Sequence, residues 1–469
     1  MGPSTEDENV LRELILNGMN VARFNFSHGS HEYHKAGMER VRRIAKEVGA
    51  NVAIMLDTKG PEIRTGMLKD HEPVMLETDK TCVITTDEGV EGTAERFSLD
   101  YKELPGDVEP GSIILIDDGL IALEVTKVEG NDIHCRINNG GKLGERKGVN
   151  VPNVKLNLPA VTEQDEKDLI FGCEMGIDAV SCSFIRDAAG VNEIRKILES
   201  HGGDRVSVYS KIECAAGVTN FDEILEASSG IMVARGDLGV EVPPAMVPHL
   251  QKMMIDKCNK AYKPVITATQ MLDSMIRNPR PTRAECTDVA NAIYDGTDCV
   301  MLSGETAAGL YPVEAVRMMT DICLETEKYV HERDEYVDRG GFRNVNGSIG
   351  YAAAEIANRV NAKAILCPTT TGRTARLISK FRPHENILAT SSSEKTVRKC
   401  CFYWGVDAWL VDYQATIDDT IDAAIDNAKA QSIIGEDDLV VVTAGDPRTS
   451  PKQGTYTTST NLLLVAQVH

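Results

Sequence analysis

The chain has 469 residues and a formal net charge of −21, from 50 Lys and Arg against 71 Asp and Glu. A chain this acidic is unsuited to non-specific binding of nucleic acid or of anionic lipid, so an anionic ligand needs a local cluster of positive charge. At roughly 100–200 residues per domain, the length predicts two to four domains.

The cysteine pattern points to the cytoplasm. The 12 cysteines include no Cys-x-x-Cys pair and no zinc-like spacing, which favours reduced thiols over a disulfide framework. No run of 18 apolar residues is present, and MGPSTEDENV (1–10) lacks the apolar core of a signal peptide. We expect a cytoplasmic protein with neither a membrane partner nor a nucleic-acid partner.

Strands and helices alternate over residues 19–58 and 162 to about 330. The strand-like runs are short, apolar and rich in Val and Ile, as is typical of parallel strands buried on both faces. They are MNVARFNF (19–26), NVAIMLDT (51–58), AVSCSFIR (179–186), SVYSKIE (207–213), GIMVARGD (230–237), KPVITATQ (263–270) and DCVMLSGE (298–305). Helical segments such as GVNEIRKILESHG (190–202) follow them. Repeated β-then-α units predict either an open doubly wound sheet or a (β/α)8 barrel, and a barrel needs one more strand.

Two other units flank or interrupt this series. Between the strand ending near residue 58 and the helix starting near 162, short strands alternate with Gly and Asp turns, which predicts an all-β insertion of about 100 residues. Beyond about residue 340, helices and strands such as KAILCPT (363–369) and DLVVVTAG (438–445) predict a smaller open α/β sheet. The expected domains are 1–59 with 159–338, then 60–158, then 339–469.

Polar residues gather where five of the first strands end. They are Arg23, Asn25 and Ser27; Asp57 and Thr58, with Glu62 and Arg64 just beyond; Lys211 and Glu213; Asp237; and Thr269. In barrel enzymes the active site is built at this rim. Each residue alone has a plain structural interpretation as an ion pair, a cap or a turn, but five strand ends with the same bias predict a site for anions and metals.

The stretch VYSKIEC (208–214) shows the chemistry most directly. Lys211 and Glu213 are two residues apart, so in a strand they point to one face. Glu213 and Asp237 are hard oxygen ligands suited to Mg²⁺ or Mn²⁺, and Lys211 adds a compact positive charge. Arg23 and Arg64 can bind phosphate oxygens in bidentate fashion. A metal, a lysine and two arginines match the demands of phosphoryl transfer.

At these residues the sequence resembles the pyruvate kinase family. The resemblance extends from residue 2 to the end and rests on long motifs, among them VARFNFSHG, MLDTKGPEIRTG, ILIDDGLI, RKGVNVP, LPAVTEQDEKDL, VARGDLGVE, TATQMLDSM, PTRAECTDVANAI and LSGETAAGLYPVEAV. It implies a (β/α)8 TIM barrel, an inserted all-β cap domain and a C-terminal open α/β regulatory domain. It also implies transfer of a phosphoryl group from phosphoenolpyruvate to ADP, giving pyruvate and ATP in glycolysis, by a cytoplasmic homotetramer.

The resemblance also implies roles for single residues. Lys211, Arg23 and Thr269 resemble catalytic residues, and the substrate would be bound by these with Gly236 and Asp237. Glu213 and Asp237 would hold Mg²⁺ or Mn²⁺. The residues that resemble a K⁺ site are Asn25, Ser27, Asp57 and Thr58, and Glu62 implies dependence on K⁺. The residues that resemble nucleotide contacts are Asn25, Phe26, Ser27, His28, Arg64 and Lys147.

Two further features concern the ends of the chain. The family's first strand, an apolar run before GPS, is not in this sequence, either because it is truly absent or because it was trimmed; if it is truly absent, we expect an open seam beside its neighbouring strands. In CPTTTGRTARLISKFRP (367–383), hydroxyls precede a helix start, which suits either a phosphate site or a plain capped turn. In the family the matching loop binds the phosphate of an allosteric effector, which implies Thr369, Thr370, Thr371, Gly372, Arg373 and Thr374, with residues 444–461 as a second wall.

Two rival functions remain open on the sequence. A metal-dependent aldolase or lyase on a related barrel would use the carboxylates without needing Lys211, the K⁺ residues or the insertion. A catalytically silent relative that only binds a sugar phosphate would have lost Lys211, Glu213 or Asp237, and all three are present.

Overall fold

A parallel sheet of seven strands forms the centre of the molecule. The computed structural model describes residues 1–330, 345–445 and 460–469. The sheet order is β1-β2-β12-β13-β14-β15-β16, with β1 Val21–Asn25, β2 Ala53–Asp57, β12 Ala179–Cys182, β13 Ser207–Ile212, β14 Gly230–Ala234, β15 Val265–Ala268 and β16 Cys299–Val300. All seven strands expected from the sequence are therefore confirmed, and they are neighbours in chain order.

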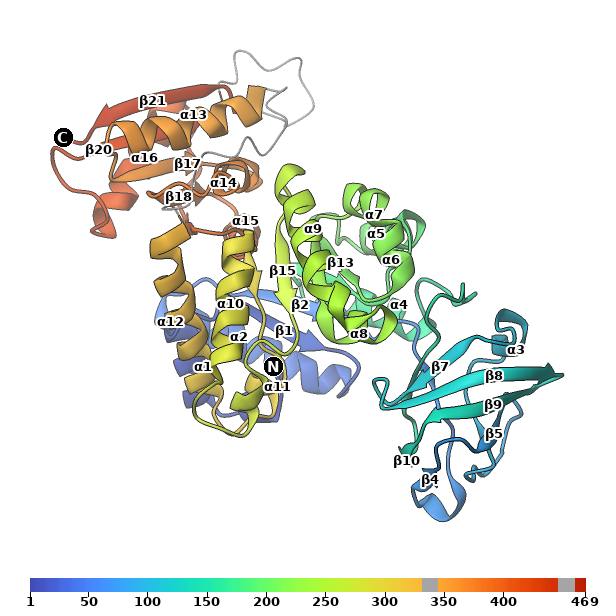
Figure 1. Cartoon of the computed structure of the whole chain (residues 1–469). Coiled ribbons are helices and arrows are strands. Elements are labelled where there is room, and N and C mark those ends of the chain that lie inside the picture. Colours follow the sequence, from blue (N-terminus) through green and yellow to red (C-terminus); the bar gives the residue numbers. More distant parts are fainter. Residues whose placement is uncertain (331–344, 446–459) are drawn as a thin grey trace.

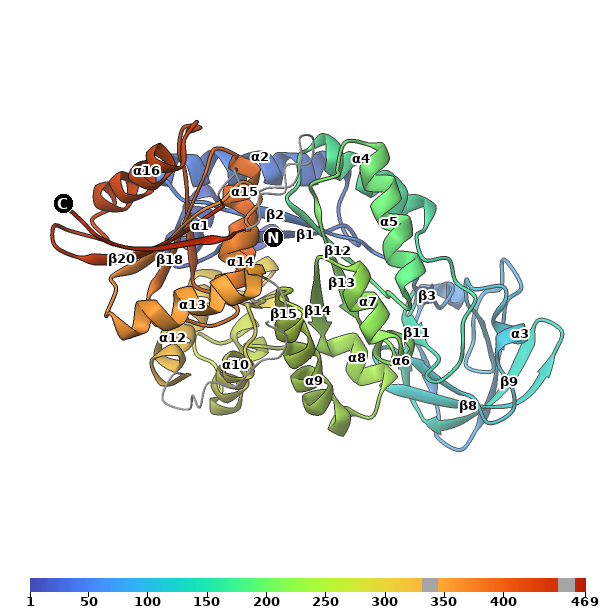
Figure 2. The same ribbon diagram turned by 90° about the horizontal axis from the view of Figure 1, so that it is seen from above.

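The sheet curls into a barrel with helices on its outside (Figures 1 and 2). These helices are α1 Glu8–Leu16, α2 His31–Val48, α4 Glu163–Glu174, α5 Ala188–Ser200, α6 Ala215–Thr219, α7 Phe221–Ala227, α8 Arg235–Glu241, α9 Val247–Lys260, α10 Arg283–Asp295, α11 Gly304–Ala307 and α12 Pro312–Val330. Alternate strand residues such as Ile54 and Val208 pack under the helices, while Met55 and Tyr209 fill the interior. The period of two along each strand thus separates an outer from an inner core.

The expected seam is present. β1 and β16 are the two edges of the sheet, and no pairing joins them among the described residues. On the outside, α1 packs against α12 beside this gap.

The insertion is an antiparallel sheet with one parallel pair. Its order is β3-β11-β7-β8-β9-β5-β6, with β3 Ile63–Arg64, β5 Thr81–Thr85, β6 Arg96–Ser98, β7 Ile113–Ile116, β8 Ile121–Glu129, β9 Asp132–Asn139 and β11 Gly148–Asn150. A separate pair joins β4 Val74–Leu76 to β10 Gly141–Leu143, and α3 spans Leu104–Asp107. The prediction of an all-β insertion is confirmed, although strands of two or three residues are too short to show a period.

The C-terminal unit lies at the opposite end of the molecule from the insertion (Figure 1). Its sheet order is β19-β18-β17-β20-β21, with β17 Ala364–Pro368, β18 Asn386–Ser391, β19 Val406–Leu410, β20 Leu439–Ala444 and an antiparallel β21 Leu462–Gln467. Its helices are α13 Val345–Arg359, α14 Arg373–Ser379, α15 Glu394–Lys399 and α16 Ile417–Ala430. No helix of the described ranges combines the length and apolarity needed to cross a bilayer.

A buried ion cluster joins this unit to the barrel. Asp298, directly before β16, accepts from Val265 N at 2.9 Å and is wholly buried. It pairs with Lys380 and lies 3.2 Å from Arg382 Nη1, both from the segment after α14. Burial alone would raise the pKa of Asp298, but the two cations outweigh it and lower its pKa. One carboxylate therefore ties a barrel strand to the C-terminal unit.

We expect Asp298→Asn to destabilise the protein by about 3–5 kcal/mol, because it leaves two buried cations without their counter-charge. The measurement is urea unfolding, with Asp412→Asn, an exposed acid of the C-terminal unit, as the matched control. Equal unfolding midpoints for the two variants would contradict the role given to the cluster.

Candidate active site

The side chains at the end of β13 meet side chains at the ends of β12 and β2. Lys211 Nζ lies 2.8 Å from Glu213 Oε1 and 3.3 Å from Asp57 Oδ1. Lys211 also donates to Ser183 Oγ at 2.8 Å. The prediction that Lys211 and Glu213 share one face of the strand is confirmed. Burial would lower the pKa of Lys211, but the two carboxylates outweigh it and raise its pKa above that of free lysine, so the side chain stays an ammonium.

Arg23 and Asp57 form a second ion pair on the adjacent strands β1 and β2. The Arg23 guanidinium contacts Asp57 Oδ2, and the Asp57 side chain is wholly buried. Burial opposes ionisation of Asp57, but Arg23 and Lys211 outweigh it and lower its pKa. Asp57 thus holds Arg23 and Lys211 on either side of one carboxylate, and both cations remain near the rim.

Two acids at the rim have raised pKa values, so a bound cation would stabilise their ionised forms. Burial, followed by the repulsion of Asp237, raises the pKa of Glu213 to about 7 against the opposing effect of Lys211. Burial also raises the pKa of Asp237, and the nearby Asp118 and Glu62 add to this. Glu213 Oε2 accepts from Phe184 N at 2.6 Å, which fixes its orientation. A divalent cation bound by the two acids would offset the free-energy cost of burying their charges and of their mutual repulsion.

The two acids of the rim are not part of a larger cluster of metal-binding side chains in the described part of the chain. No group of three or more His, Cys, Asp or Glu side chains is arranged to hold a metal ion within residues 1–330, 345–445 and 460–469. Two carboxylates are nevertheless sufficient for Mg²⁺, which keeps several waters and takes further ligands from a substrate. The donor set of Glu213 and Asp237 therefore fits the expected cation.

The start of α8 and the end of β15 meet closely. A Cβ on Gly236 would lie 2.7 Å from Thr269 Cγ2, so only glycine fits there without a shift. Thr269 has φ of 74°, a left-handed conformation that costs about 1–3 kcal/mol in a non-glycine residue and is found most often at functional sites. Arg235 supports this turn, since its guanidinium donates to Ala268 O at 3.0 Å and Thr269 O at 2.7 Å.

The residues expected to bind K⁺ surround the end of β2. Asn25 Oδ1 accepts from Ser27 N at 3.1 Å, and Phe26 N donates to Asp57 O at 2.9 Å. Thr58 Oγ1 accepts from Ser183 N at 3.1 Å. Asp57 Oδ1 is buried and lies 3.3 Å from the Lys211 ammonium, so a K⁺ ion at this oxygen would share it with Lys211.

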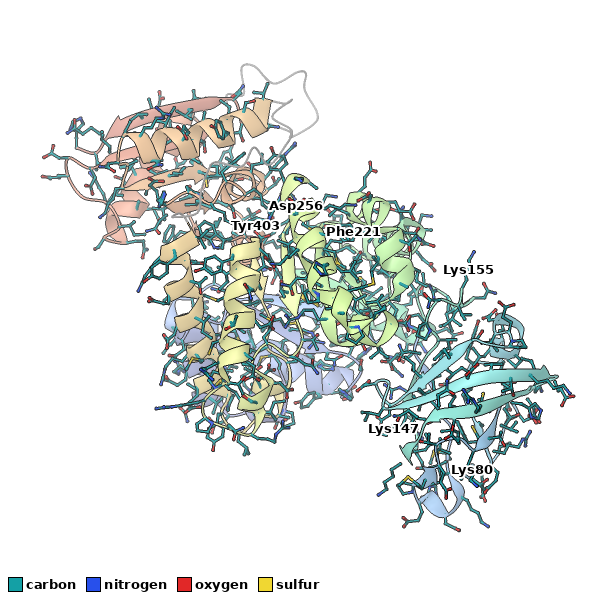
Figure 3. The ribbon with its side chains drawn as sticks, viewed as in Figure 1. Lys80, Lys147, Lys155, Phe221, Asp256 and Tyr403 are labelled. Atoms are coloured by element: carbon teal, nitrogen blue, oxygen red, sulfur yellow. The ribbon has the colours of Figure 1, made fainter. Side chains whose placement is uncertain are left out.

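The residues expected to contact the nucleotide come from two units. Phe26 is 8% exposed and its ring stacks on His34, which leaves its backbone as the group that can contact a ligand. His28 is exposed, and its carbonyl pairs with His34 Nε2 at 2.7 Å. Arg64 and Lys147 lie at the insertion, where Figure 3 labels Lys147, and each is already paired with an acid.

Those two acids are Glu62 and Asp117. Arg64 Nη2 lies 2.6 Å from Glu62 Oε2, and Lys147 Nζ lies 2.9 Å from Asp117 Oδ1. A phosphate bound here would have to compete with these carboxylates for the two cations.

The loop expected to bind an effector joins β17 to α14. Gly372 has φ of 78°, and its N–H is held by Thr369 Oγ1 at 3.0 Å. Thr374 Oγ1 lies 2.7 Å from Thr460 Oγ1, and Thr370 O accepts from Thr396 Oγ1 at 2.9 Å. Thr371 and Arg373 are exposed. Of the expected second wall, residues 446–459 lie outside the described residues.

Two residues of the site were not predicted from the sequence. Ser183 contacts Lys211 and Thr58, and Arg235 holds the Thr269 turn. Both follow strands, in SCSFIR and VARGD, so their positions after predicted strands were the available signal. Their partners lie on other strands, and only the closed sheet shows those contacts.

The curled parallel sheet, the inserted β sheet and the charged rim together define a barrel enzyme. The family model "Pyruvate kinase, barrel domain" matches residues 1–316, and "Pyruvate kinase, alpha/beta domain" matches residues 347–466. Pyruvate kinases of Staphylococcus epidermidis and Sporosarcina psychrophila are each 48% identical to the chain, over 95% of this chain and 77% of theirs. A crystal structure of a pyruvate kinase from Cryptosporidium parvum matches with a TM-score of 0.92 at 40% identity, covering 100% of this chain and 95% of that chain. The chain belongs to the pyruvate kinase family.

Proposed function

We propose that this protein transfers the phosphoryl group of phosphoenolpyruvate to ADP, as a step of glycolysis in the cytoplasm. The single observation that carries the proposal is the Lys211 ammonium, held between Asp57 and Glu213 at 3.3 and 2.8 Å. Phosphoryl transfer depends mainly on positioning and on neutralising the equatorial oxygens, which a fixed ammonium at a carboxylate-lined rim provides.

The proposed roles are those that the family resemblance implies for the residues of this rim. The bond between phosphorus and the enol oxygen breaks while a bond to the terminal phosphate oxygen of ADP forms. Lys211 and Arg23 stabilise the charge on the moving group, and the turn of Gly236 and Thr269 binds the substrate carboxylate. The enolate left behind takes up a proton on its terminal carbon near Thr269.

Two cations complete the proposed site. When bound at Glu213 and Asp237, Mg²⁺ or Mn²⁺ would supply neutralisation of phosphate and carboxylate oxygens. K⁺ would be held by Asn25, Ser27, Asp57 and Thr58. Phe26, His28, Arg64 and Lys147, with Asn25 and Ser27, would contact ADP.

The test of this function is a coupled assay for pyruvate, with phosphoenolpyruvate, ADP, Mg²⁺ and K⁺. ADP-dependent formation of pyruvate supports the proposal. Enolate chemistry on pyruvate without ADP would instead favour a lyase, and sugar-phosphate binding with no turnover would favour a silent relative.

The K⁺ requirement makes a separate prediction. Glu62 lies near Asp237, whose pKa it helps to raise, so an ammonium at this position would reach the charged rim. Glu62→Lys is expected to retain most activity when K⁺ is replaced by a large organic cation, while the parent loses about 100-fold (about 2.7 kcal/mol). Glu62→Gln, which removes the charge without adding an ammonium, is the control and should stay K⁺-dependent. An unchanged K⁺ requirement in Glu62→Lys would count against the assignment.

Regulation and assembly are proposed by the same resemblance. A phosphorylated allosteric effector would bind at Thr369, Thr370, Thr371, Gly372, Arg373 and Thr374. The protein would assemble as a homotetramer. Each subunit would have three domains, formed by residues 1–59 with 159–338, by 60–158 and by 339–469. The boundary at 338 lies outside the described residues.

The effector loop is tested by substitution of its exposed cation. The parent is first screened with fructose 1,6-bisphosphate, a sugar monophosphate and a nucleotide. Arg373→Ala should weaken activation by whichever of these activates the parent about tenfold while leaving activity without effector unchanged, because a charge-assisted hydrogen bond is worth roughly 1.5–3 kcal/mol. Activation curves for the variant and the parent provide the measurement, and superimposable curves would remove Arg373 from the site.

A further inference from the structure

The loop after β1 carries four residues that are proposed to contact a cation or a nucleotide, namely Asn25, Phe26, Ser27 and His28. Phe26 N donates to Asp57 O at 2.9 Å, which fixes the start of the loop against β2. Ser27 N and His28 N donate back to Asn25, to its Oδ1 at 3.1 Å and its carbonyl oxygen at 3.3 Å. The position of residues 27–29 therefore depends on what they contact beyond the loop.

That contact is made by His34, which lies in the first turn of α2. The side chain of His34 is buried, and its Nε2 lies 2.7 Å from the carbonyl oxygen of His28. A carbonyl oxygen only accepts hydrogen bonds, so Nε2 carries a proton and donates. In the part of the chain that the structure describes, this is the one hydrogen bond that ties residues 27–29 to another element.

The other ring nitrogen of His34 defines the protonation state of the ring. Nδ1 is buried and has no hydrogen-bond partner within the described residues, so a proton on it would be left unsatisfied. Burial lowers the pKa of His34, against the opposing effects of the His28 carbonyl and of Asp168. His34 is therefore a neutral ring at pH 7, and its single ring proton is on Nε2.

Aromatic packing sets the direction of this N–H group. The ring of Phe26 stacks on the imidazole with centroids 4.1 Å apart, and the ring of Phe24 meets it edge-on at 6.0 Å. A Cβ on Gly29 would lie 3.3 Å from His34 Nε2, so the loop backbone lies directly against the imidazole. A ring packed in this way cannot rotate freely, and it holds the His28 carbonyl in one orientation.

We propose that His34 is a positioning residue for the nucleotide: its Nε2–H fixes the peptide between His28 and Gly29 and so orients Ser27 and His28 toward ADP. This inference rests on the proposed phosphoryl transfer to ADP. The cations proposed to stabilise the moving phosphoryl group have their own anchor, because Asp57 pairs with both Arg23 and Lys211. Loss of the His34 hydrogen bond should therefore weaken the use of ADP and spare that of phosphoenolpyruvate.

Two variants that carry the same amide group test this role. The amide nitrogen of glutamine can take the place of Nε2, whereas the asparagine side chain is one bond shorter and does not reach the His28 carbonyl. At saturating Mg²⁺ and K⁺, His34→Asn should raise KM for ADP about fivefold, the effect of one hydrogen bond, with kcat and KM for phosphoenolpyruvate unchanged. His34→Gln should restore KM for ADP to that of the parent.

A matched control removes a similar hydrogen bond elsewhere. His201 is exposed, and its Nδ1 lies 2.9 Å from the carbonyl oxygen of Ile197. His201→Asn should leave KM for ADP unchanged. Equal KM values for ADP in His34→Asn and His34→Gln, or an equal rise of both Michaelis constants in His34→Asn, would overturn the proposal.

Two further measurements separate this role from folding and from the proposed function. Calorimetric titration with ADP, without phosphoenolpyruvate, should show the same loss of affinity in His34→Asn and its recovery in His34→Gln. A parent that binds ADP but forms no pyruvate would refute the proposed function and leave this comparison valid. Nuclear magnetic resonance of the parent with isotopically labelled histidine should show the His34 ring protonated on Nε2, and a proton on Nδ1 instead would overturn the proposal even where His34→Asn does not fold.

Discussion

Replacing Lys211 by methionine is expected to slow phosphoryl transfer by three or more orders of magnitude, a loss of at least ~4 kcal/mol of transition-state stabilisation. Lys211 is the buried ammonium at the rim, 2.8 Å from Glu213 Oε1 and held by Ser183. Methionine keeps the length and apolar stem but has no charge to place against the migrating group. The measurement is kcat in the coupled pyruvate assay with saturating substrates and Mg²⁺.

The same variant separates catalysis from metal binding. Lys211 opposes the effects that raise the pKa of Glu213, so its loss should raise that pKa further and weaken Mn²⁺ binding near neutral pH only modestly. Lys102→Met, an exposed lysine paired with the exposed Glu88, is the matched control and should keep full activity, since exposed ion pairs contribute little. Near-normal turnover in Lys211→Met would contradict the role given to this residue.

Replacing Glu213 by glutamine is expected to weaken Mn²⁺ binding at least 100-fold and to reduce kcat/KM by about three orders of magnitude. The variant removes one of the two carboxylates proposed to hold the divalent cation, and a neutral amide oxygen is a poorer ligand. Mn²⁺ titration followed by electron paramagnetic resonance measures the binding independently of turnover. Glu241→Gln, a half-buried acid on α8 held by Asn150 at 2.9 Å, is the control.

The pH dependence of Mn²⁺ binding tests the same assignment. The pKa of Glu213 is raised to about 7, so this carboxyl takes up a proton as the pH falls through neutrality. A bound cation requires the ionised form, so affinity in the parent should fall up to about tenfold per pH unit below pH 7. In Glu213→Gln this slope should become shallower. A pH-independent affinity in the parent between pH 5 and 7 would contradict the shared site.

Much of the barrel and of its rim could be predicted because the relevant signals lie within short segments of the sequence. Short Val- and Ile-rich runs identify strands buried on both faces, and all seven were placed correctly. The period of two along a strand put Lys211 beside Glu213. The strands β3, β6, β10 and β11 were not predicted, because two or three residues cannot show a period. Pairing with other strands holds them extended, either with a strand distant in the chain, as for β3 with β11, or with a nearer one, as for β6 with β5.

Contacts between strands were decided only by the tertiary structure. Asp57 is shared by Arg23 and Lys211, Arg235 holds the carbonyl of Thr269, and Asp298 is bound by cations of the C-terminal unit. The two partners of each contact are tens of residues or more apart in the chain, so no local sequence pattern encodes which acid meets which cation. The pKa values of Glu213 and Asp237 depend on burial, which is likewise a property of the assembled sheet.

The sequence by itself thus determined an α/β fold of repeated β-then-α units, the positions of the barrel strands along the chain and the residue types at their ends, because these follow from hydrophobic periodicity and from chemistry carried within short segments. The tertiary structure decided the ion-pair partners, the turn of Gly236 against Thr269 and the open seam between β1 and β16. The physical reason is that electrostatic and steric effects act through space, over distances set by how the whole sheet closes.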